Sequence, residues 1–341
     1  MSMKSHIVAA TITLAVGAPG FYATAAHAAD DVTIRINFTP WGMHAPIFAA
    51  KSQGFYEEED INLSIVPPSQ GQQNEVFIAR GEEQFGLSNS DSFLKARANG
   101  LPVVAIMADQ PSSPAGIISL KESGIDSPEK LEGKKITWIQ SNIEGMLNPL
   151  LESGGLERSD IELMNVTRGA EVQLLAAGQV DALYGFTYGQ ALTLEENGYE
   201  VNVLALKDYG LDIYGTVFYT SETVLENDPE LVERFLRATL KGYEWTLANQ
   251  QEAVSYVIEV SPDRNLELET RKLGIIYDTY ATPEFGERFG LMSDAKWTES
   301  IDILGGDLPT KPEVGDLYTN EFVEKLQESA DFTKALSSTS N

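Results

Sequence analysis

Few side chains in this chain can do covalent or acid–base chemistry. Its 341 residues include three histidines and no cysteine. Without cysteine there is no disulfide framework, no thiolate zinc site and no cysteine nucleophile. The hydrolase elbow Gly-x-Ser-x-Gly, the dinucleotide fingerprint Gly-x-Gly-x-x-Gly and the P-loop are also missing from the sequence. We therefore expect a binding protein without catalytic residues, metal or cofactor. A secreted hydrolase or lyase that uses two carboxylates as acid and base remains a rival.

The N-terminus indicates export, and export leaves one histidine. Residues 1–28 have the pattern of a secretory signal peptide: a lysine near the start, an apolar stretch over 7–26 and the small-x-small site Ala26-His27-Ala28. Cleavage would remove two of the three histidines and leave His44 as the one imidazole of the mature chain. An N-terminal membrane anchor is the alternative, but Gly and Pro residues interrupt the apolar stretch before it reaches about 20 residues.

The chain is strongly acidic, since 51 Asp and Glu residues against 24 Lys and Arg residues give a formal net charge of -27. A negative field of this size repels nucleic acid and anionic lipid surfaces, so we expect neither as a partner. The acidic residues are scattered rather than gathered in a tail, which is typical of a solvated surface. No second apolar stretch has the length of a transmembrane helix, and we expect a soluble monomer.

Hydrophobic patterns alternate between strand and helix over most of the chain. Strands are predicted at 32–38, 61–66, 84–87, 103–108, 116–120, 135–138, 161–165, 182–186, 201–206 and 215–220. Helices are predicted at 45–53, 74–80, 90–99, 127–131, 146–153, 171–177, 191–197 and 229–249, with further helices over 250–330. This order and spacing predict an α/β fold with mainly parallel sheets.

The pattern forms two similar α/β units followed by a helical tail. We expect lobe 1 to begin with 29–113, lobe 2 to comprise 114–218, and 219–341 to return to lobe 1 and form the C-terminal helices. Two crossings, near 109–116 and 209–219, would join the lobes and permit hinge closure. Two independent domains in series are the alternative. A ligand would lie between the lobes, at the carboxyl ends of the strands.

Aromatic and polar residues follow the strands of lobe 1 where such a ligand would lie. Trp41 can stack on a planar ring, and His44 can exchange hydrogen bonds with a polar ligand, although each has an alternative role in packing. The turn Ser88-Asn89-Ser90 joins a strand to a helix, so one of its last two residues would cap the helix and direct N–H groups into the cleft. Gln110 offers one acceptor and two donors to a heterocycle.

Lobe 2 repeats this arrangement. The turn Ser141-Asn142 also joins a strand to a helix, and Phe186 and Tyr188 follow the next strand as candidate aromatic contacts. Asp212 and Tyr214 mark the return crossing, where the carboxylate could pair with a cationic or amino group of the ligand. We expect the two sets of turns to face each other as a clamp.

Six motifs occur in order along the chain. They are Trp41-x-x-His44-Ala45-Pro46, Gly54-Phe55-Tyr56-Glu57-Glu58, Gly81-x-x-x-Phe85-Gly86, Ala96-Arg97-x-x-Gly100-x-Pro102-Val103-Val104, Ser127-Pro128-x-x-Leu131-x-Gly133-Lys134 and Ala177-Gly178-Gln179-Val180-Asp181-Ala182. Together they resemble the periplasmic substrate-binding proteins of ABC importers, most closely the NMT1/THI5-like branch. The resemblance implies a type II periplasmic binding protein fold, a periplasmic location and an inner-membrane ABC permease as partner.

Members of that branch bind thiamine-pyrimidine precursors, alkanesulfonates, taurine or riboflavin. The branch also includes fungal enzymes that make the thiamine pyrimidine from a histidine of their own chain with pyridoxal phosphate. The export signal and the absence of those enzymes' cysteine-rich motif favour a binder here. Whether the binder serves transport or signals to a membrane receptor is left open by the sequence.

Residue types favour one class of ligand. No Lys or Arg lies in the candidate turns, and Arg168 is the nearest basic candidate in lobe 2. Sulfonates and carboxylates are usually held by Arg or by several backbone N–H groups. The aromatic and amide side chains instead favour a flat, neutral or weakly basic, pyrimidine-like heterocycle over an alkanesulfonate, taurine or an aromatic carboxylate.

Overall fold

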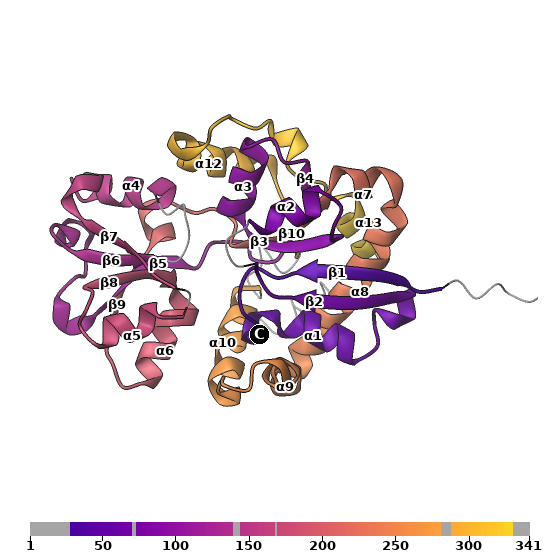
Figure 1. The fold of residues 1–341 in the computed structure, drawn as a ribbon, viewed down its shortest axis with the longest axis horizontal. Coiled ribbons are helices and arrows are strands. Elements are labelled where there is room, and N and C mark those ends of the chain that lie inside the picture. Colours follow the sequence, from indigo (N-terminus) through magenta and orange to yellow (C-terminus); the bar gives the residue numbers. More distant parts are fainter. Residues whose placement is uncertain (1–27, 70–72, 139–143, 168, 281–287, 330–341) are drawn as a thin grey trace, which may run out of the picture.

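Two lobes of strands and helices lie side by side in the computed structural model of the protein (Figure 1). The structure describes residues 28–69, 73–138, 144–167, 169–280 and 288–329. Lobe 2, drawn in magenta, carries the strands from β5 to β9, and lobe 1 carries the remaining strands. The chain crosses from lobe 1 to lobe 2 after β4 and returns before β10.

Lobe 1 is built on a five-stranded sheet with the order β2-β1-β3-β10-β4. Its strands are β1 (Asp30–Arg35), β2 (Ile61–Val66), β3 (Phe85–Asn89), β4 (Val103–Ala108) and β10 (Thr216–Ser221). β1 is parallel to β2 and to β3, whereas β10 is antiparallel to β3 and to β4. β4 is buried along its whole length, in keeping with its continuous apolar sequence.

Lobe 2 has a second five-stranded sheet, with the order β7-β6-β8-β5-β9. Its strands are β5 (Ala115–Leu120), β6 (Lys135–Trp138), β7 (Glu162–Asn165), β8 (Ala182–Phe186) and β9 (Val201–Ala205). β6 is parallel to β7 and β8, whereas β5 is antiparallel to β8 and β9. The two sheets therefore repeat the same mixture of parallel and antiparallel pairs.

The sheets are mainly parallel, as expected, because four of the five strands in each sheet run the same way, but each sheet also contains one antiparallel strand that arrives from the other lobe. β5 follows the first crossing and β10 the second, and each is inserted between two strands that run the opposite way. A strand that starts at the junction of the lobes must run away from it, whereas its neighbours end there. β10 begins at Thr216, so the boundary expected after residue 218 falls inside a strand of lobe 1.

Helices cover both faces of each sheet (Figure 1). Those before and after lobe 2 are α1 (Ala45–Ser52), α2 (Asn74–Ala79), α3 (Ser90–Ala98), α7 (Glu222–Asn227), α8 (Pro229–Ala248), α9 (Gln250–Val260), α10 (Leu266–Tyr280), α12 (Asp294–Leu304) and α13 (Glu321–Ser329). Those of lobe 2 are α4 (Glu144–Ser153), α5 (Glu171–Ala176) and α6 (Leu192–Glu196). A π-helical turn, η6 (Thr187–Ala191), precedes α6, so the helix expected at 191–197 is shorter than predicted.

α8 is the longest described helix and packs against the sheet of lobe 1. Pro229 stands in its first turn, and the Asp228 carboxylate accepts a hydrogen bond from the Leu231 N–H at 3.1 Å. Both are local signals for a helix start. The Phe235 ring of α8 stacks on Phe85 of β3, with 3.8 Å between the ring centroids. The amphipathic pattern read from the sequence therefore has its apolar face against the sheet.

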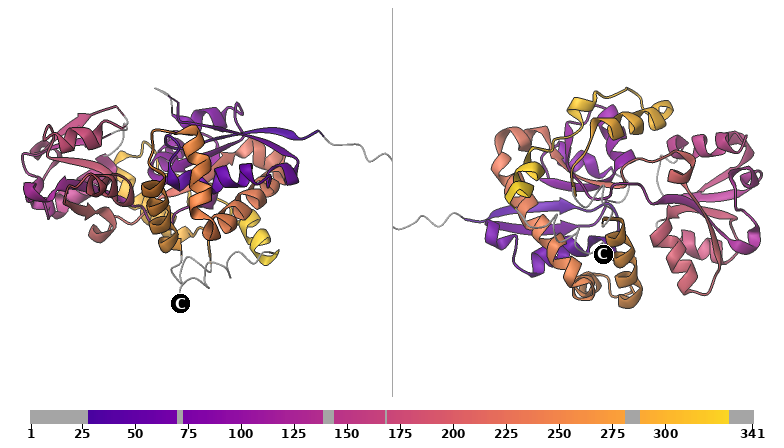
Figure 2. Two further views of the ribbon diagram at one scale, coloured as in Figure 1. Left: turned by 90° about the horizontal axis from the view of Figure 1, so that it is seen from below. Right: turned by 180° about the vertical axis from the view of Figure 1, so that it is seen from behind.

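Two C-terminal helices join the lobes on opposite sides of the crossings (Figures 1 and 2). α12 packs against α3 of lobe 1 and α4 of lobe 2, and its Trp297 belongs to the same buried cluster as Leu147 of α4. α10 contacts η6 and α6 of lobe 2, where Arg271 forms an ion pair with Glu196. The helical tail is thus part of the junction between the lobes.

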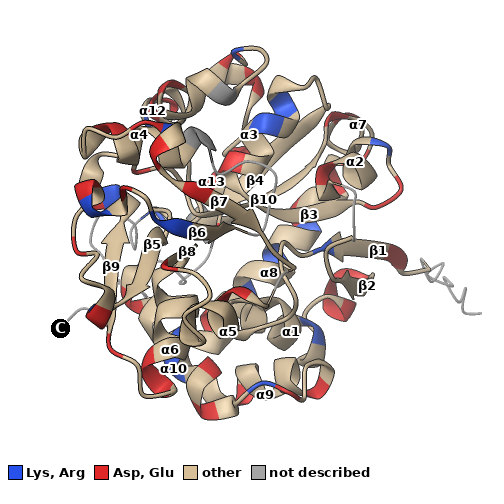
Figure 3. Ribbon diagram, turned by 60° about the vertical axis from the view of Figure 1, so that its left-hand side comes forward, with Lys and Arg blue, Asp and Glu red and all other residues tan. Residues whose placement is uncertain are grey.

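Acidic side chains are spread over helices and loops of both lobes (Figure 3). Within the described ranges, no helix is long and apolar enough to cross a membrane. The same residues include no group of three or more His, Asp or Glu side chains that could hold a metal ion.

The contact between α8 and α1 depends on a glycine. A Cβ atom at Gly242 would lie 2.4 Å from the Pro46 carbonyl oxygen and 2.6 Å from the Ala50 Cβ. Gly242→Ala should therefore lower the free energy of unfolding by about 1–3 kcal/mol, because well-packed helices cannot take an added methyl group without moving apart. Urea unfolding measures the change. Gly306→Ala, where a Cβ meets open space, is the control, and equal midpoints in the two variants would contradict the packing argument.

Candidate ligand-binding site

Two predicted aromatic residues, one from each lobe, meet at the junction. The rings of Trp41 and Tyr188 are stacked, with 6.2 Å between centroids and 24° between planes. Trp41 is 5% exposed and Tyr188 8% exposed. Phe186, at the end of β8, lies edge-on to Tyr188 at 6.1 Å. The ends of strands in the two lobes thus bring these three rings together.

The loop that carries Trp41 is anchored by an ion cluster formed by the buried Glu269 and Lys272 of α10 and the half-buried Arg264 just before that helix. The Gly42 N–H donates to Glu269 Oε2 at 2.8 Å, and Glu269 Oε1 accepts from Lys272 at 2.9 Å and from Arg264 at 3.4 Å. Lys272 Nζ also lies 6.0 Å from the centroid of the Trp41 indole. Sequence reasoning missed this cluster, because 227 residues separate Gly42 from Glu269 and no local pattern links them.

His44 is fully buried and takes part in a chain of hydrogen bonds. Its Nδ1 atom accepts from the Trp41 N–H at 3.3 Å, and its Nε2 atom lies 2.9 Å from Asn37 Oδ1. Asn37 Nδ2 in turn donates to Asn89 Oδ1 at 2.8 Å. Burial, and next the positive charge of Arg264, lower the pKa of the His44 imidazole to about 3. The imidazole is therefore neutral at physiological pH.

The turn after β3 does not cap α3 as expected. Asn89 stands at the position before the helix, but its side chain makes no capping bond and instead accepts from Asn37. The Ser90 hydroxyl donates to the Tyr214 carbonyl oxygen, and the Ser88 hydroxyl donates to the Glu75 carboxylate at 2.5 Å. Ser88 and Ser90 therefore donate their hydroxyl protons to acceptors within the protein, and neither hydroxyl accepts from the free N–H groups at the start of α3. Asn89 alone keeps donor atoms for other use.

Two acidic residues near this turn, the buried Glu75 and the half-buried Asp91, were not predicted. Burial raises the pKa of the Glu75 carboxyl group, and the hydrogen bond from Ser88 opposes that rise. Burial also raises the pKa of Asp91, in the first turn of α3, to about 6. The negative charge of Asp91 adds to the burial that raises the pKa of Tyr184 on β8. No sequence pattern marks either acid, since both lie in ordinary helix-start positions.

The two crossings are bonded together at Asp109 and Gln110. Asp109 is buried and accepts hydrogen bonds from the hydroxyls of Thr216 at 2.5 Å, Tyr243 at 2.5 Å and Tyr280 at 2.9 Å. Gln110 is 2% exposed, and its Nε2 donates to the thioether of Met43 at 3.2 Å. Its Oε1 is buried and has no hydrogen-bond partner among the described residues. Gln110 therefore holds an unused acceptor beside the loop of Trp41.

Asp212 and Tyr214, the other two predicted residues near the return crossing, contact α12 or the residue before it instead of the Trp41 loop. Asp212 accepts from Lys296 Nζ at 2.8 Å and from the Ser112 hydroxyl, so its charge is already paired. The Tyr214 ring packs on Trp297, with 5.1 Å between centroids, and its hydroxyl accepts from the Ser293 N–H at 2.9 Å. The expected ion pair between Asp212 and a ligand is replaced by one with α12. Sequence could not place α12 beside the return crossing.

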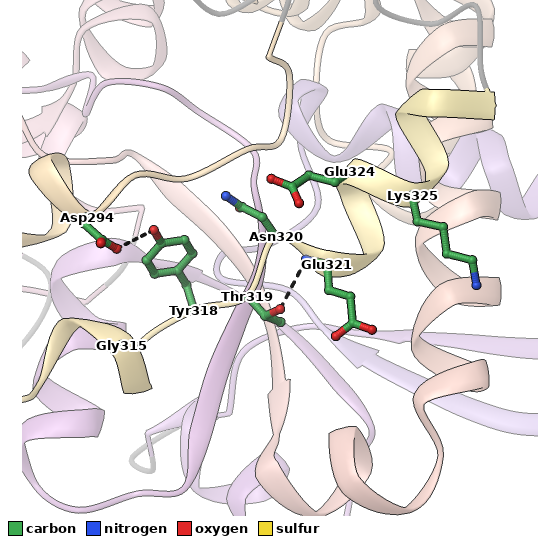
Figure 4. A pocket seen from close by; sticks show the side chains of 8 residues that line it. All are labelled: Asp294, Gly315, Tyr318, Thr319, Asn320, Glu321, Glu324 and Lys325. Atoms are coloured by element: carbon green, nitrogen blue, oxygen red, sulfur yellow. Dashed lines mark hydrogen bonds between the residues drawn. The ribbon is translucent and has the colours of Figure 1, made fainter.

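Ser141, Asn142 and Arg168 lie outside the described residues. The open hollow in Figure 4 is a different feature, beside α12 and α13, lined by Asp294, Gly315, Tyr318, Thr319, Asn320, Glu321, Glu324 and Lys325. Its labelled residues include none of those predicted to bind a ligand, and Tyr318 there donates to Asp294 at 2.6 Å. The candidate site is therefore the group formed by the buried residues Trp41, His44, Gln110 and Tyr188 and the half-buried Asn89.

Comparison with known proteins agrees with the fold. A family model described as NMT1/THI5 like matches residues 41–253. The formylaminopyrimidine-binding protein of Halalkalibacterium halodurans is 27% identical over 286 residues, which are 81% of this chain and 85% of that protein. The 4-amino-5-hydroxymethyl-2-methylpyrimidine phosphate synthase of Legionella pneumophila is 29% identical over 307 residues, 86% of this chain and 92% of that protein.

A solved structure has the same two-lobed architecture. The periplasmic aliphatic sulphonate binding protein SsuA from Escherichia coli superimposes with a TM-score of 0.66 over 84% of this chain and 91% of its own, at 17% identity. At that identity the likeness concerns the fold alone. The α/β fold of periplasmic binding proteins, expected from the sequence, is confirmed.

The neutral, buried state of His44 predicts a pH dependence of stability. Because the folded pKa is about 3 and the unfolded pKa about 6.5, only the unfolded chain binds this proton between those values, so stability falls as the pH falls. Between pH 6 and pH 4 the wild type should lose about 2–3 kcal/mol more unfolding free energy than His44→Gln. Urea unfolding at both pH values measures this, and the histidines of the leader cancel in the comparison. Equal losses would show that His44 is protonated in the folded protein.

Proposed function

Because the chain belongs to the NMT1/THI5-like family, we propose that it is the solute-binding component of an ABC importer. The observation that carries the proposal is the meeting of Trp41 and Tyr188 from opposite lobes. A ligand held between such rings touches both lobes at once, and contacts to both lobes stabilise the closed form. Binding and closure are then the whole chemistry, with no bond made or broken.

The ligand that suits this site best is a planar, pyrimidine-like heterocycle. Aromatic faces stand about 3.5–4 Å apart in contact, so a ring seated between Trp41 and Tyr188 needs about 7–8 Å between their centroids. The two rings are stacked on each other with 6.2 Å between centroids, so a flat ring can enter only when the lobes separate. The unpartnered Gln110 Oε1 offers an acceptor to an amino group on that ring. Relatives include a formylaminopyrimidine-binding protein, which supports this class.

A sulfonate, taurine or an aromatic carboxylate is the second candidate, and one observation favours it. Lys272 and Arg264 bring positive charge to the loop of Trp41, where the sequence indicated none. Both cations, however, already contact Glu269. An anion would have to compete with that buried carboxylate, which makes the neutral heterocycle the better fit.

An enzymatic role is the weaker alternative, although pyrimidine synthases occur among the relatives. His44 is fully buried, and both of its ring nitrogens are within hydrogen-bonding distance of protein groups. A histidine held in this way is poorly placed to be attacked or to move a proton of a ligand. A role as ligand-sensing subunit stays compatible with the same binding site.

The proposal includes a place in the cell. The mature protein would act as a monomer in the periplasm, after removal of residues 1–28, and would present its closed form to an inner-membrane ABC permease. The export pattern of the N-terminus and the fold support this placement. A net charge of -27 disfavours nucleic acid as a partner.

Binding of a named pyrimidine tests the function. Isothermal titration calorimetry should detect 4-amino-5-hydroxymethyl-2-methylpyrimidine and should show weaker binding or none with taurine. Trp41→Ala and Tyr188→Ala should each weaken pyrimidine binding about tenfold, because each removes one stacking face.

Tyr199→Ala is the matched control, because Tyr199 is an exposed tyrosine of lobe 2 at 37% exposure. Binding of taurine alone would overturn the heterocycle assignment. Unchanged affinity for the pyrimidine in both aromatic variants would remove the stack from the site.

A further inference from the structure

The hydrogen bonds through His44, Asn37 and Asn89 have a direction, and one backbone group sets it. The Trp41 N–H can only donate, so the His44 Nδ1 atom that lies 3.3 Å from it must carry a lone pair. Because the buried imidazole is neutral, its proton is then on Nε2. The tautomer of His44 thus follows from the backbone of the loop and from burial.

The direction continues through two amides. His44 Nε2–H donates to the atom of Asn37 that lies 2.9 Å away, which must therefore be the oxygen. The amide nitrogen of Asn37 is left to donate to Asn89, so the Asn89 atom at 2.8 Å must be an oxygen as well. The positions of the oxygen and nitrogen in each amide thus follow from the donor that precedes it in the chain of hydrogen bonds.

Asn89 stands at the end of this chain with two N–H donors. Its Oδ1 is occupied by Asn37, and no hydrogen bond in the described part of the chain uses its Nδ2. Asn89 ends β3, where alternation places its side chain on the same face as Phe85 and Leu87. Those two residues belong to the buried cluster that also contains Trp41 and Tyr188. The donors are therefore on the side of the sheet where the aromatic stack lies.

We propose that Asn89 determines specificity by donating an Nδ2–H to an acceptor of the ligand, such as a pyrimidine ring nitrogen, and that His44 and Asn37 are positioning residues that hold Asn89 in the donor orientation. This inference rests on the proposed function and adds which partner donates and which accepts in one hydrogen bond. The ligand must then present a lone pair to lobe 1. His44 acts on the ligand through Asn37 and Asn89, and its own ring need not touch the ligand.

The test compares two ligands that differ only in the acceptor. The first is 4-amino-5-hydroxymethyl-2-methylpyrimidine, and the second is (2-amino-4-methylphenyl)methanol, its analogue with CH in place of both ring nitrogens. The wild type should bind the pyrimidine about tenfold more tightly than the analogue, because the analogue leaves a buried donor unpaired. Calorimetry on the full chain gives both dissociation constants.

Two variants then test the polarity. Asn89→Asp keeps an oxygen for Asn37 but has no donor, so it should lose the tenfold preference. Asn37→Asp can only accept, so Asn89 must turn its nitrogen toward the new carboxylate and its oxygen toward the ligand. That variant should lose the preference too, although residue 37 would not contact the ligand in this scheme. A structural defect alone would weaken the binding of both ligands equally and leave the ratio of their dissociation constants unchanged.

The outcomes separate the two proposals. A wild type that binds neither compound overturns the proposed ligand class, and the Asn89 contact with it. A wild type that binds the pyrimidine while both variants keep its preference overturns the polarity alone. As a measurement independent of binding, nitrogen-15 NMR of the full chain carrying H6Q and H27Q should show His44 as the Nε2–H tautomer. An Nδ1–H tautomer would also overturn the chain of bonds.

Discussion

The buried carboxylate of Asp109 is the constraint on which the arrangement of the lobes depends. It receives hydroxyl donors from β10, α8 and α10, at the place where the chain leaves lobe 1 and where it returns. Burial raises the pKa of this carboxyl group, and the three hydroxyls oppose that rise by stabilising the charged form. Backbone bonds also tie the crossings together, with the Asp109 N–H on the Thr216 carbonyl at 2.9 Å and the Gly215 N–H on the Gln110 carbonyl at 3.1 Å. The two connections are therefore hydrogen-bonded to each other rather than being two separate linkers.

α10 connects Asp109 at the crossings with the loop that carries Trp41 of the aromatic stack. Tyr280 at its end bonds Asp109, while Glu269 near its start holds the Gly42 N–H and thereby the loop of Trp41. Between them, Arg271 reaches Glu196 of lobe 2. These three attachments connect the loop of Trp41, the crossings and lobe 2 through one helix. This explains why the C-terminal helices, which look like an appendage in the sequence, contribute to the site.

The site combines an ion cluster with neutral amides, and each has a different task. Glu269 forms ion pairs with Arg264 and Lys272 and also accepts from the Gly42 N–H of the Trp41 loop. A charge that is removed from water needs such partners. The amides of Asn89 and Gln110 keep unused hydrogen-bonding atoms, which is the property that a ligand needs. In the proposed function, recognition would depend on the orientation of these amides rather than on net charge, and an acidic protein could bind a neutral molecule without help from its long-range field.

Features that depend on near neighbours could be predicted from the sequence. Hydrophobic patterns located the described strands and the helices up to α8 except α7, gave the later helices only as a helical region, and the motif around Trp41 and His44 marked the loop that lies in the junction. The sequence did not determine the direction of β5 and β10, because strand direction follows from the path between lobes and not from local periodicity. The tertiary structure alone decided that Glu269 holds Gly42, that Lys296 takes Asp212, and that Asn37 orients Asn89. Each of these contacts joins residues far apart in the chain or on different elements, and hydrogen bonds are short, so only the folded arrangement of strands and helices could select them.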